Sequence, residues 1–569
     1  MGGSGVQVPY NIFAWVGASL LILVSLARVY LLGHLKLHVS TFYYLLALVF
    51  MLFPLFYTDR LFLDVETLRL LGLAAGVLFL VALQQFINDR FGDYALKVLL
   101  VSAVIQSAWG LVQYYVIFDP SPLFWSAAKG APYGVFQQVN VFAIYTAMGS
   151  MLVLRLVSLP TGNATWIRAL AAVLIFANAH LAVLSGANSA LVVSFVSVVV
   201  YLVYLSWAGY IVKRLALMFF ACLLAGALLP KSWVDIRPTL DNVVSKQIQH
   251  QGSGAVNTQS INVNEGYALS SNESKSPLGT RPTIYRTSVE MFLESPWVGH
   301  GIGSFRKQYL LYQGEYLKEH PDAPAEFNLS HPHNELLYWA VELGFLPLVG
   351  FLIIGLAWYS GVRTGALELQ TLLVALPLVL QSLLELPFYH SVAHYLAFML
   401  ILVAACKSSN GIKTYKLPRW SAIISVPISL LGAFKVWMFL FSTYYALMMF
   451  LLFNASGREN VSYLLEVNNP SAFKLRYEFE LFQWKLREAR KKGEFDVEEL
   501  NNYLRWAFST VQYAPMQTTY ENFVASLVLI NKKKAARRYL DEALLIYPNN
   551  QKLKEFDRQL RALEVSRSG

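Results

Sequence analysis

Long apolar runs separated by short polar loops dominate the first 455 residues of the chain. A membrane-spanning helix needs about 20 mainly apolar residues. Runs of about that length lie at 13–32, 41–57, 68–83, 96–118, 139–158, 166–184, 189–207, 211–229, 336–359, 368–384, 391–406 and within 420–453. The pattern therefore predicts an all-α polytopic membrane protein with about twelve transmembrane helices.

One polar segment of roughly 100 residues, 231–330, interrupts the apolar runs. It closes on the sequence His-Pro-His-Asn-Glu at 331–335, directly before the apolar pattern resumes at Leu336. Imidazoles exchange protons near neutral pH. At a boundary between water and bilayer they lie where a lipid-borne substrate presents its head group. This position predicts chemistry on a membrane-anchored substrate.

Beyond residue 455 the composition becomes that of a soluble helical domain. An amphipathic helix pair is predicted at 520–530 and 534–546, and Pro548 follows it. The pair resembles one tetratricopeptide-type repeat, although no strict repeat period is visible. Further helices are predicted at 475–490 and 498–513. The tail is therefore expected to be helical and repeat-like.

These patterns divide the chain into four predicted parts. They are a transmembrane bundle at 1–230, a loop with catalytic elements at 231–335, further transmembrane helices at 336–455 and a soluble helical domain at 456–569. Lys and Arg cluster in alternate short loops, and such loops face the cytoplasm. The long loop, the helical tail and the N-terminus are then expected outside.

Composition agrees with a membrane location. Of the 569 residues, 56% are hydrophobic and only 14% are charged, against about a quarter charged in soluble domains. The net charge of +10 is explained by Lys and Arg in the short loops that set the membrane topology, and it does not imply binding to nucleic acid. Cys222 and Cys406 lie in apolar runs, so no disulfide framework or cysteine-based metal site is predicted. The run at 13–32 is expected to be retained, because no signal-peptide cleavage pattern accompanies it.

The strongest candidates for chemistry are His331 and His333. A neutral imidazole can accept the proton of a hydroxyl as that hydroxyl attacks, which typically contributes about 10²–10⁴-fold to a rate. Pro332 restricts itself and the preceding residue, and Asn334 or Glu335 could orient a ring. Histidines at helix ends are also common as interface residues. A metal site is not predicted, because the spacing suggests no third ligand.

Arg281 and Arg286 are candidates for binding phosphate. A guanidinium is always charged, and its forked shape suits a phosphate or diphosphate. Glycines at 299, 301 and 303 follow and could let backbone amides approach an anion. The alternative is a solvated loop with ordinary surface arginines. Gln138 and Asn140 enter a predicted span and could bind sugar hydroxyls, or could serve only in helix capping and interhelical bonding.

No P-loop, Rossmann glycine fingerprint or G-x-S-x-G sequence is present, so neither nucleotide hydrolysis nor a cofactor is expected. Four polar residues, Asn178, His180, Glu342 and Lys435, fall within predicted spans. They are candidate sites, because burying polar groups in lipid is costly.

Taken together, these residues resemble the O-antigen ligase / O-antigen polymerase superfamily, and more closely its bacterial protein O-oligosaccharyltransferase branch. The resemblance covers roughly residues 95 to 405 and rests on four motifs. These are Gly134-x-Phe136-x-Gln138-x-Asn140, Arg281 ahead of Ser295-Pro296-x-x-Gly299-x-Gly301-x-Gly303-x-Phe305, His331-x-His333-Asn334, and Leu383-Leu384-Glu385-Leu386-Pro387.

The resemblance implies a glycan carried on undecaprenyl diphosphate and transferred at the periplasmic face of the bacterial inner membrane, without nucleotide or metal. By the same resemblance, His333 activates the acceptor hydroxyl and Arg281 stabilises the diphosphate leaving group. The substrate-binding residues implied are Arg286, Tyr285, His331, Asn334, Gln138 and Asn140.

The chain departs from the family pattern at two places. Many members carry an arginine in a Ser-Arg-small motif at the outer end of a middle span, whereas 184–189 here reads Leu-Ser-Gly-Ala-Asn-Ser. The family's common Gln-Pro-Asn is Gln-Val-Asn at 138–140. A second phosphate-binding arginine is thereby in doubt, and Asn188 is only a weak substitute for it.

Three functions compete. They are transfer of a glycan to a protein such as a pilin, ligation to lipid A core or polymerisation, and transport. Helical repeat pairs commonly form peptide-docking surfaces, and the protein-modifying branch tends to carry such a tail. We therefore predict a glycosyltransferase that modifies Ser or Thr of a pilin-like acceptor by a single inverting displacement.

Overall fold

The computed structural model describes residues 7–57, 60–116, 131–136, 138–159, 165–209, 213–229, 280–407, 410–418, 420–492 and 496–565. Residues 231–279, the first part of the predicted polar loop, lie outside the described residues. Helices form almost all of the regular structure in the described ranges, and the strands form one two-stranded sheet. The predicted all-α class is confirmed.

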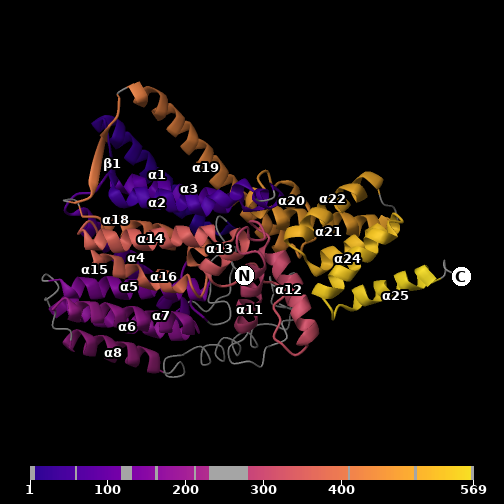
Figure 1. Ribbon diagram of the computed structural model, residues 1–569, viewed down its shortest axis with the longest axis horizontal. Coiled ribbons are helices and arrows are strands. Elements are labelled where there is room, and N and C mark those ends of the chain that lie inside the picture. Colours follow the sequence, from indigo (N-terminus) through magenta and orange to yellow (C-terminus); the bar gives the residue numbers. More distant parts are fainter. Residues whose placement is uncertain are drawn as a thin grey trace, which may run out of the picture. The chain divides into compact units, whose positions relative to one another are not determined.

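The N-terminal apolar runs form helices close to the predicted ranges (Figure 1). They are α1 (Pro9–Leu32), α2 (Val39–Leu52) with η2 (Phe53–Phe56), α3 (Arg60–Gln84), α4 (Phe91–Tyr115), α5 (Val139–Ser158), α6 (Thr165–Leu184), α7 (Asn188–Trp207) and α8 (Lys213–Leu228). Across the described residues, 9 helices are long and apolar enough to cross a membrane, and three shorter apolar helices accompany them. The chain is a multi-pass membrane protein.

Two predicted single spans are interrupted. The run at 336–359 forms α13 (Glu335–Leu343) and α14 (Leu346–Arg363), with Gly344 between them at φ 72°. The run at 368–384 is divided into short helical pieces, namely α15 (Leu369–Leu372), η5 (Leu373–Ala375) and α16 (Leu376–Gln381). By contrast, the run within 420–453 is one helix, α19 (Trp420–Ala455), which continues through Pro427. The remaining helices of this region are α17 (Pro387–His390) and α18 (Val392–Ala404).

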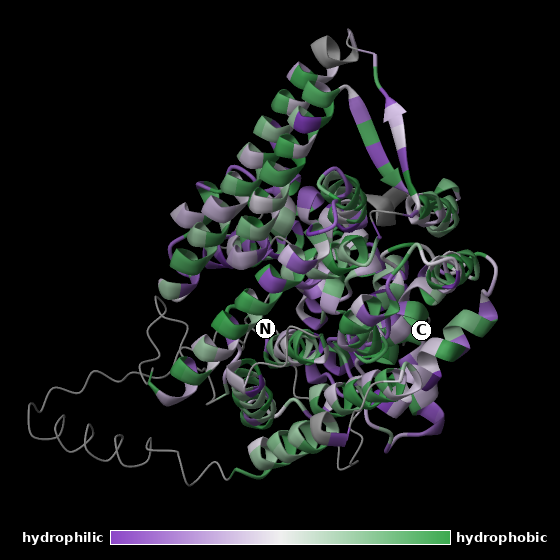
Figure 2. Ribbon diagram, turned by 90° about the vertical axis from the view of Figure 1, so that its left-hand side faces the viewer, coloured by the Kyte–Doolittle hydropathy of each residue, from purple (hydrophilic) through white to green (hydrophobic). Residues whose placement is uncertain are grey.

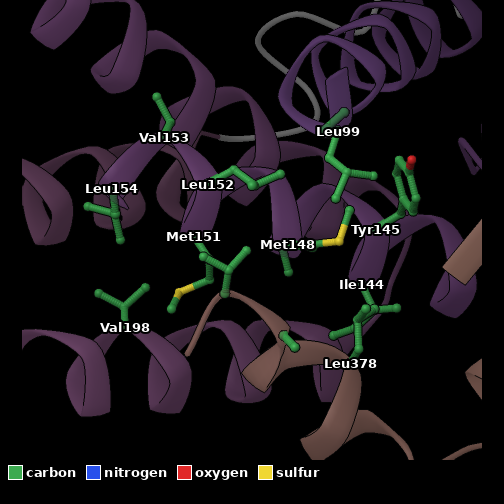
Figure 3. Packing of buried hydrophobic residues seen from close by; sticks show 14 of the residues in the cluster. Leu99, Ile144, Tyr145, Met148, Met151, Leu152, Val153, Leu154, Val198 and Leu378 are labelled. Carbon is green, nitrogen blue, oxygen red and sulfur yellow. The ribbon is translucent and has the colours of Figure 1, made fainter. Parts of the chain in front are cut away.

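The chain divides into two compact units. Unit 1 comprises Met1–Tyr43, Gly72–Asn262 and Leu356–Phe441. Its central helix is α5, which packs against α4, α6, α7 and α16. Figure 3 shows Leu99 of α4, Val198 of α7 and Leu378 of α16 around the buried side chains of α5. Apolar packing therefore carries the core of this unit.

Polar side chains inside unit 1 bond across helices. Asn178 donates to the carbonyl oxygen of Thr146 at 2.8 Å and accepts from the Ser107 hydroxyl at 2.7 Å. His180 contacts the Tyr115 hydroxyl at 2.6 Å and the carbonyl oxygen of Gly226 at 3.2 Å. These contacts join α4, α5, α6 and α8. They account for Asn178 and His180 by interhelical hydrogen bonding.

The sheet of unit 1 joins two loops that are far apart in the sequence. Strand β1 (His34–His38) pairs antiparallel with β2 (Ile412–Lys416), with Lys36 opposite Thr414. Figure 2 shows polar and apolar residues alternating in colour along the His-Leu-Lys-Leu-His sequence of β1. The pairing brings the loop that carries Lys36 together with the loop that carries Lys413 and Lys416.

Unit 2 comprises Tyr44–Leu71, Val263–Gly355 and Ser442–Gly569. Its C-terminal helices are α20 (Ser462–Leu465), η6 (Ser471–Phe473), α21 (Lys474–Lys492), α22 (Val497–Tyr513), α23 (Gln517–Leu529), α24 (Lys533–Ile546) and α25 (Gln551–Val565). Successive helices from α22 to α25 pack on one another. The predicted amphipathic pair is confirmed as α23 and α24.

Among its described residues, the polar loop contributes two helices to unit 2, α11 (Arg281–Glu294) and α12 (Phe305–Glu319). Helix α12 packs against α22 and α24 (Figure 1). Its buried Lys307 donates to the Tyr520 hydroxyl at 2.9 Å and forms an ion pair with Glu542. A side chain at Gly314 would lie 2.6 Å from the carbonyl oxygen of Leu545. The loop helix is thus built into the C-terminal helical domain.

Candidate functional site

Six of the eight predicted site residues lie in one segment of unit 2, residues 280–344. The segment runs from α11 through residues 295–304, the glycine loop, to α12, and then through an extended stretch to α13. Helix α11 packs against both α12 and α13. Gln138 and Asn140 belong to unit 1.

His333 has a left-handed backbone with φ 54°, which few non-glycine residues adopt. Its amide donates to Nδ1 of His331 at 3.3 Å, and the two rings meet edge to face at 4.7 Å. Because Nδ1 accepts this bond, a neutral His331 carries its proton on Nε2. A strained backbone costs on the order of 1–3 kcal/mol and is concentrated at functional sites. The conformation therefore marks His333 as a functional candidate.

Asn334 begins helix α13. Its side-chain oxygen accepts from the amide of Leu337 at 2.9 Å, as an N-cap residue does. Glu335 accepts from the indole nitrogen of Trp339 at 2.9 Å. The capping bond fixes where α13 starts, and therefore fixes the position of His333 directly before it.

Tyr285 approaches the histidines from α11, the helix that begins at Arg281. The Tyr285 hydroxyl donates to the carbonyl oxygen of His333 at 3.4 Å. Arg281 is partly buried and lies one turn before Tyr285, and residues four apart share a helix face. The face of α11 that carries Arg281 is therefore the face that meets residues 331–333, the histidine segment.

Arg286 lies on a different part of α11. It is exposed, pairs with Glu290 at 3.0 Å and stacks over the ring of Tyr316 at 4.9 Å. The hydrogen bond that Arg286 donates to Glu290 is the main cause that raises the pKa of Arg286, so the group is always charged. The structure thus separates the two arginines that the sequence analysis grouped as one phosphate site.

The glycine loop serves a purpose that sequence analysis did not predict. Gly299, Gly301 and Gly303 all have positive φ. The amides of His300 and Gly301 donate to the carbonyl oxygens of Val341 at 2.9 Å and Glu342 at 2.8 Å. A side chain at Gly299 would lie 2.4 Å from the carbonyl oxygen of Glu342.

The loop amides therefore satisfy the last carbonyls of α13, which a helix end leaves without partners. The amides of His300 and Gly301 are occupied by these carbonyls and do not take the anion-binding role that the sequence suggested for the loop. The amide of Gly303 also has a protein acceptor, the side chain of Glu342 at 2.9 Å. Positive φ explains all three glycines, and close packing against α13 is a second reason at Gly299.

Sequence analysis missed Arg69, which lies in the part of α3 that belongs to unit 2. Its guanidinium contacts a carboxylate oxygen of Glu342 at 2.7 Å and is covered by the rings of Tyr338 and Trp339. The available signal was an arginine at the edge of a predicted span with an acidic residue, Glu66, one turn before it. Arg69 and Glu342 are 273 residues apart, so no local sequence spacing predicts that they pair.

Gln138 and Asn140 lie at the start of α5 and are partly buried. Gln138 is the N-cap residue by backbone conformation, but its side chain makes no capping hydrogen bond in the described structure. The preceding turn is held by Gln113, whose side-chain oxygen accepts from the amides of Tyr133 and Gly134, each at 2.9 Å. Helix capping therefore does not explain the Gln138 side chain.

Two family models match the chain. A model described as O-Antigen ligase matches residues 170–352, and a model described as virulence factor membrane-bound polymerase, C-terminal, matches residues 369–561. A comparison with curated proteins found no match. The first match includes α11, the glycine loop and both histidines, and the second includes the C-terminal helices.

The predicted membership of the O-antigen ligase superfamily is confirmed by these matches. The chain is accordingly a membrane enzyme of the ligase or polymerase kind, which transfers glycosyl groups from a lipid-linked donor.

Proposed function

We propose that this protein transfers a glycan from undecaprenyl diphosphate to a Ser or Thr hydroxyl of a periplasmic protein such as a pilin. One observation carries the proposal, the meeting of α11 with the strained histidine segment through the Tyr285–His333 hydrogen bond. That contact joins the helix bearing Arg281 to the residue best suited to accept a proton.

In the proposed reaction, the acceptor oxygen attacks the anomeric carbon of the first sugar. The proton of the hydroxyl passes to His333 as the new carbon–oxygen bond forms. The bond from the anomeric carbon to the diphosphate oxygen breaks, and Arg281 stabilises the charge of the departing diphosphate. A single displacement inverts the configuration at that carbon. His331 holds the amide of His333 and thereby supports its conformation.

The other predicted residues have narrower roles in the proposal. Asn334 acts by capping α13, and Tyr285 by binding the backbone of His333. Arg286 adds exposed positive charge that attracts an anionic donor. Gln138 and Asn140 are proposed to contact lipid or sugar hydroxyls, which the resemblance to the family implies.

The C-terminal helices favour a protein acceptor. Stacked helix pairs offer surfaces for a polypeptide, and here they also hold α12 through Lys307, Glu542 and Tyr520. An acceptor bound to these helices would be held by the same framework as α12, which directly follows the glycine loop. We propose that this domain and the histidine segment face the periplasm from the bacterial inner membrane.

A second function is ligation of glycan to lipid A core, or polymerisation of glycan units. The match of residues 369–561 to a polymerase C-terminal model is the observation that favours it. The two functions differ in acceptor and share the donor chemistry.

The acceptor is tested in cells that contain a lipid-linked glycan and a pilin. Intact-mass analysis of the secreted pilin should show the glycan when the chain is expressed, and no glycan in a matched strain without it. Unmodified pilin together with altered lipopolysaccharide would contradict protein transfer and support the second function. Immunoblotting of membranes controls for expression in each strain.

A further inference from the structure

We propose that Arg69 and Glu342 form a buried positioning pair that fixes α13 and thereby sets the geometry of His331 and His333. The inference deepens the proposed function and rests on it. Arg69 and Glu342 lie in the interior, and they would act on the reacting groups only through other side chains.

The pair is buried and closely fitted. The side chains of Arg69 and Glu342 are 8% and 0% exposed, and Nη1 of the arginine lies 2.7 Å from a carboxylate oxygen. The guanidinium lies 4.2 Å from the ring centroid of Tyr338 and 4.5 Å from that of Trp339. Its other terminal nitrogen, Nη2, has no hydrogen-bond partner among the described residues, and the two rings add cation–π contacts to the ion pair.

All three contacts come from one patch of α13. Tyr338 and Trp339 precede Glu342 by four and three residues, the spacings that bring side chains together on a helix. Helix α13 has only 9 residues, and a helix this short is marginal without tertiary contacts. Arg69 thus supplies from α3 a single group that binds much of one side of α13.

Aromatic contacts connect this patch to the histidines. The ring of Tyr338 meets the ring of His331 edge to face at 6.4 Å, and His331 meets His333 at 4.7 Å. The amide of Tyr338 also donates to the carbonyl oxygen of Asn334 at 2.9 Å. A shift of Tyr338 therefore displaces both the ring beside His331 and the first turn after His333.

The carboxylate of Glu342 holds the glycine loop as well. While one oxygen binds Arg69, the other accepts from the amide of Gly303 at 2.9 Å. One side chain therefore joins α3, the loop between α11 and α12, and α13. Glu66, which lies 3.6 Å from Nη1 of Arg69, adds a second acidic group to this cluster.

The chemistry of the pair suits orientation better than stability. A buried ion pair loses much of its attraction to desolvation, and its net contribution to stability is small. Arginine offers a flat fork that can stack and bond simultaneously, whereas lysine offers only a point charge. Arg69→Lys therefore keeps the charge beside Glu342 and removes the planar contact with Tyr338 and Trp339.

The test compares Arg69→Lys and Arg69→Met with wild type in detergent-purified protein. Transfer rates are measured with a lipid-linked glycan, using both a protein acceptor and a glycan acceptor. We expect kcat to fall about tenfold for the lysine variant and about 100-fold for the methionine variant. The KM for the acceptor should stay within about twofold, because the acceptor contacts are unchanged.

Hydrogen exchange supplies a readout that does not depend on activity. In both Arg69 variants, peptides covering 299–305 and 331–343 should exchange faster. The matched control is Arg155→Lys in unit 1, where another buried arginine pairs with Glu368 at 3.2 Å. The control should leave kcat and the exchange of these peptides unchanged.

Three outcomes would overturn the inference. They are normal kcat in both Arg69 variants, unchanged exchange of the two peptides, and an equal loss of kcat in Arg155→Lys. The proposed function fails separately, when wild type uses the glycan acceptor and leaves the protein acceptor unmodified. In that case, the transfer rates of the Arg69 variants and wild type are compared with the glycan acceptor.

Discussion

The core around α5 and the segment at 280–344 are organised by different physical means. In α5, every residue from Val141 to Arg155 is buried, and apolar side chains from neighbouring helices surround it. The segment also buries apolar side chains such as Met291 and Val341, but polar contacts and glycines fix how its helices and loops meet. Arg69, Glu342 and Gly299 each meet a specific partner at short range.

The difference predicts how each region responds to change. Apolar cores accept substitutions that conserve volume, because many weak contacts each contribute a small part of the stability. A segment built on single polar contacts and left-handed residues loses its geometry when one of them is removed. The substitutions that follow test this contrast, from the largest expected effect to the smallest.

Gly299→Ala should have the largest effect. The new side chain would lie 2.4 Å from the carbonyl oxygen of Glu342, and residue 299 has φ 73°. Strain and overlap together should cost about 2–5 kcal/mol and abolish most transfer. The control is Gly186→Ala, where φ is 66° and no atom lies within 4 Å of the new side chain. Thermal unfolding and transfer assays should separate the two, and equal effects would contradict the close-packing role of the loop.

Arg281→Ala should reduce kcat by about 10²-fold, because one donor to the developing diphosphate charge is lost. Arg286→Ala is the comparison within the same helix. The exposed pair Arg286–Glu290 is screened by water and contributes little, so this variant should change transfer by a few-fold at most. Steady-state kinetics with varied donor concentration measure both. A larger loss at Arg286 would reverse our assignment.

Lys307→Met tests the attachment of α12 to the C-terminal helices. Burial lowers the pKa of Lys307, while Glu542 opposes that shift. Removing the cation leaves Glu542 without its ion-pair partner, at a cost of about 3–5 kcal/mol. Limited proteolysis should then release the C-terminal helices earlier than in wild type. Restoration of resistance by Lys307→Met combined with Glu542→Gln would support the ion pair as the cause.

Met148→Leu in α5 should have the smallest effect. Met148 is fully buried in the apolar core, and a volume-conserving exchange usually costs less than about 1.5 kcal/mol. Transfer activity should match wild type. A large loss of activity in this variant would contradict the difference in tolerance between the α5 core and the segment at 280–344.

Hydropathy predicted much of the fold, because the length and apolar character of a span are local properties. The range 139–158 coincides with α5, and the amphipathic pair in the tail coincides with α23 and α24. The interruption at Gly344 escaped this reasoning, since an isolated glycine in an apolar run does not reveal its backbone conformation.

The candidate site was predictable by residue type and less so by arrangement. Histidine and arginine chemistry drew attention to His333 and Arg281. The left-handed backbone of His333 and the pairing of Arg69 with Glu342 depend on tertiary contacts between distant segments, which a single sequence does not encode locally. The separation of Arg286 from Arg281 follows from helical phase and could have been anticipated.

The most direct test of the central claim is the transfer rate of His333→Asn in purified protein supplied with lipid-linked glycan and acceptor. Asparagine tolerates the left-handed backbone that residue 333 adopts, so the variant removes the imidazole and keeps the local conformation. We predict that kcat falls by about 10²–10⁴-fold while thermal unfolding stays close to wild type. A kcat within a few-fold of wild type would contradict the assignment of His333 as the proton acceptor.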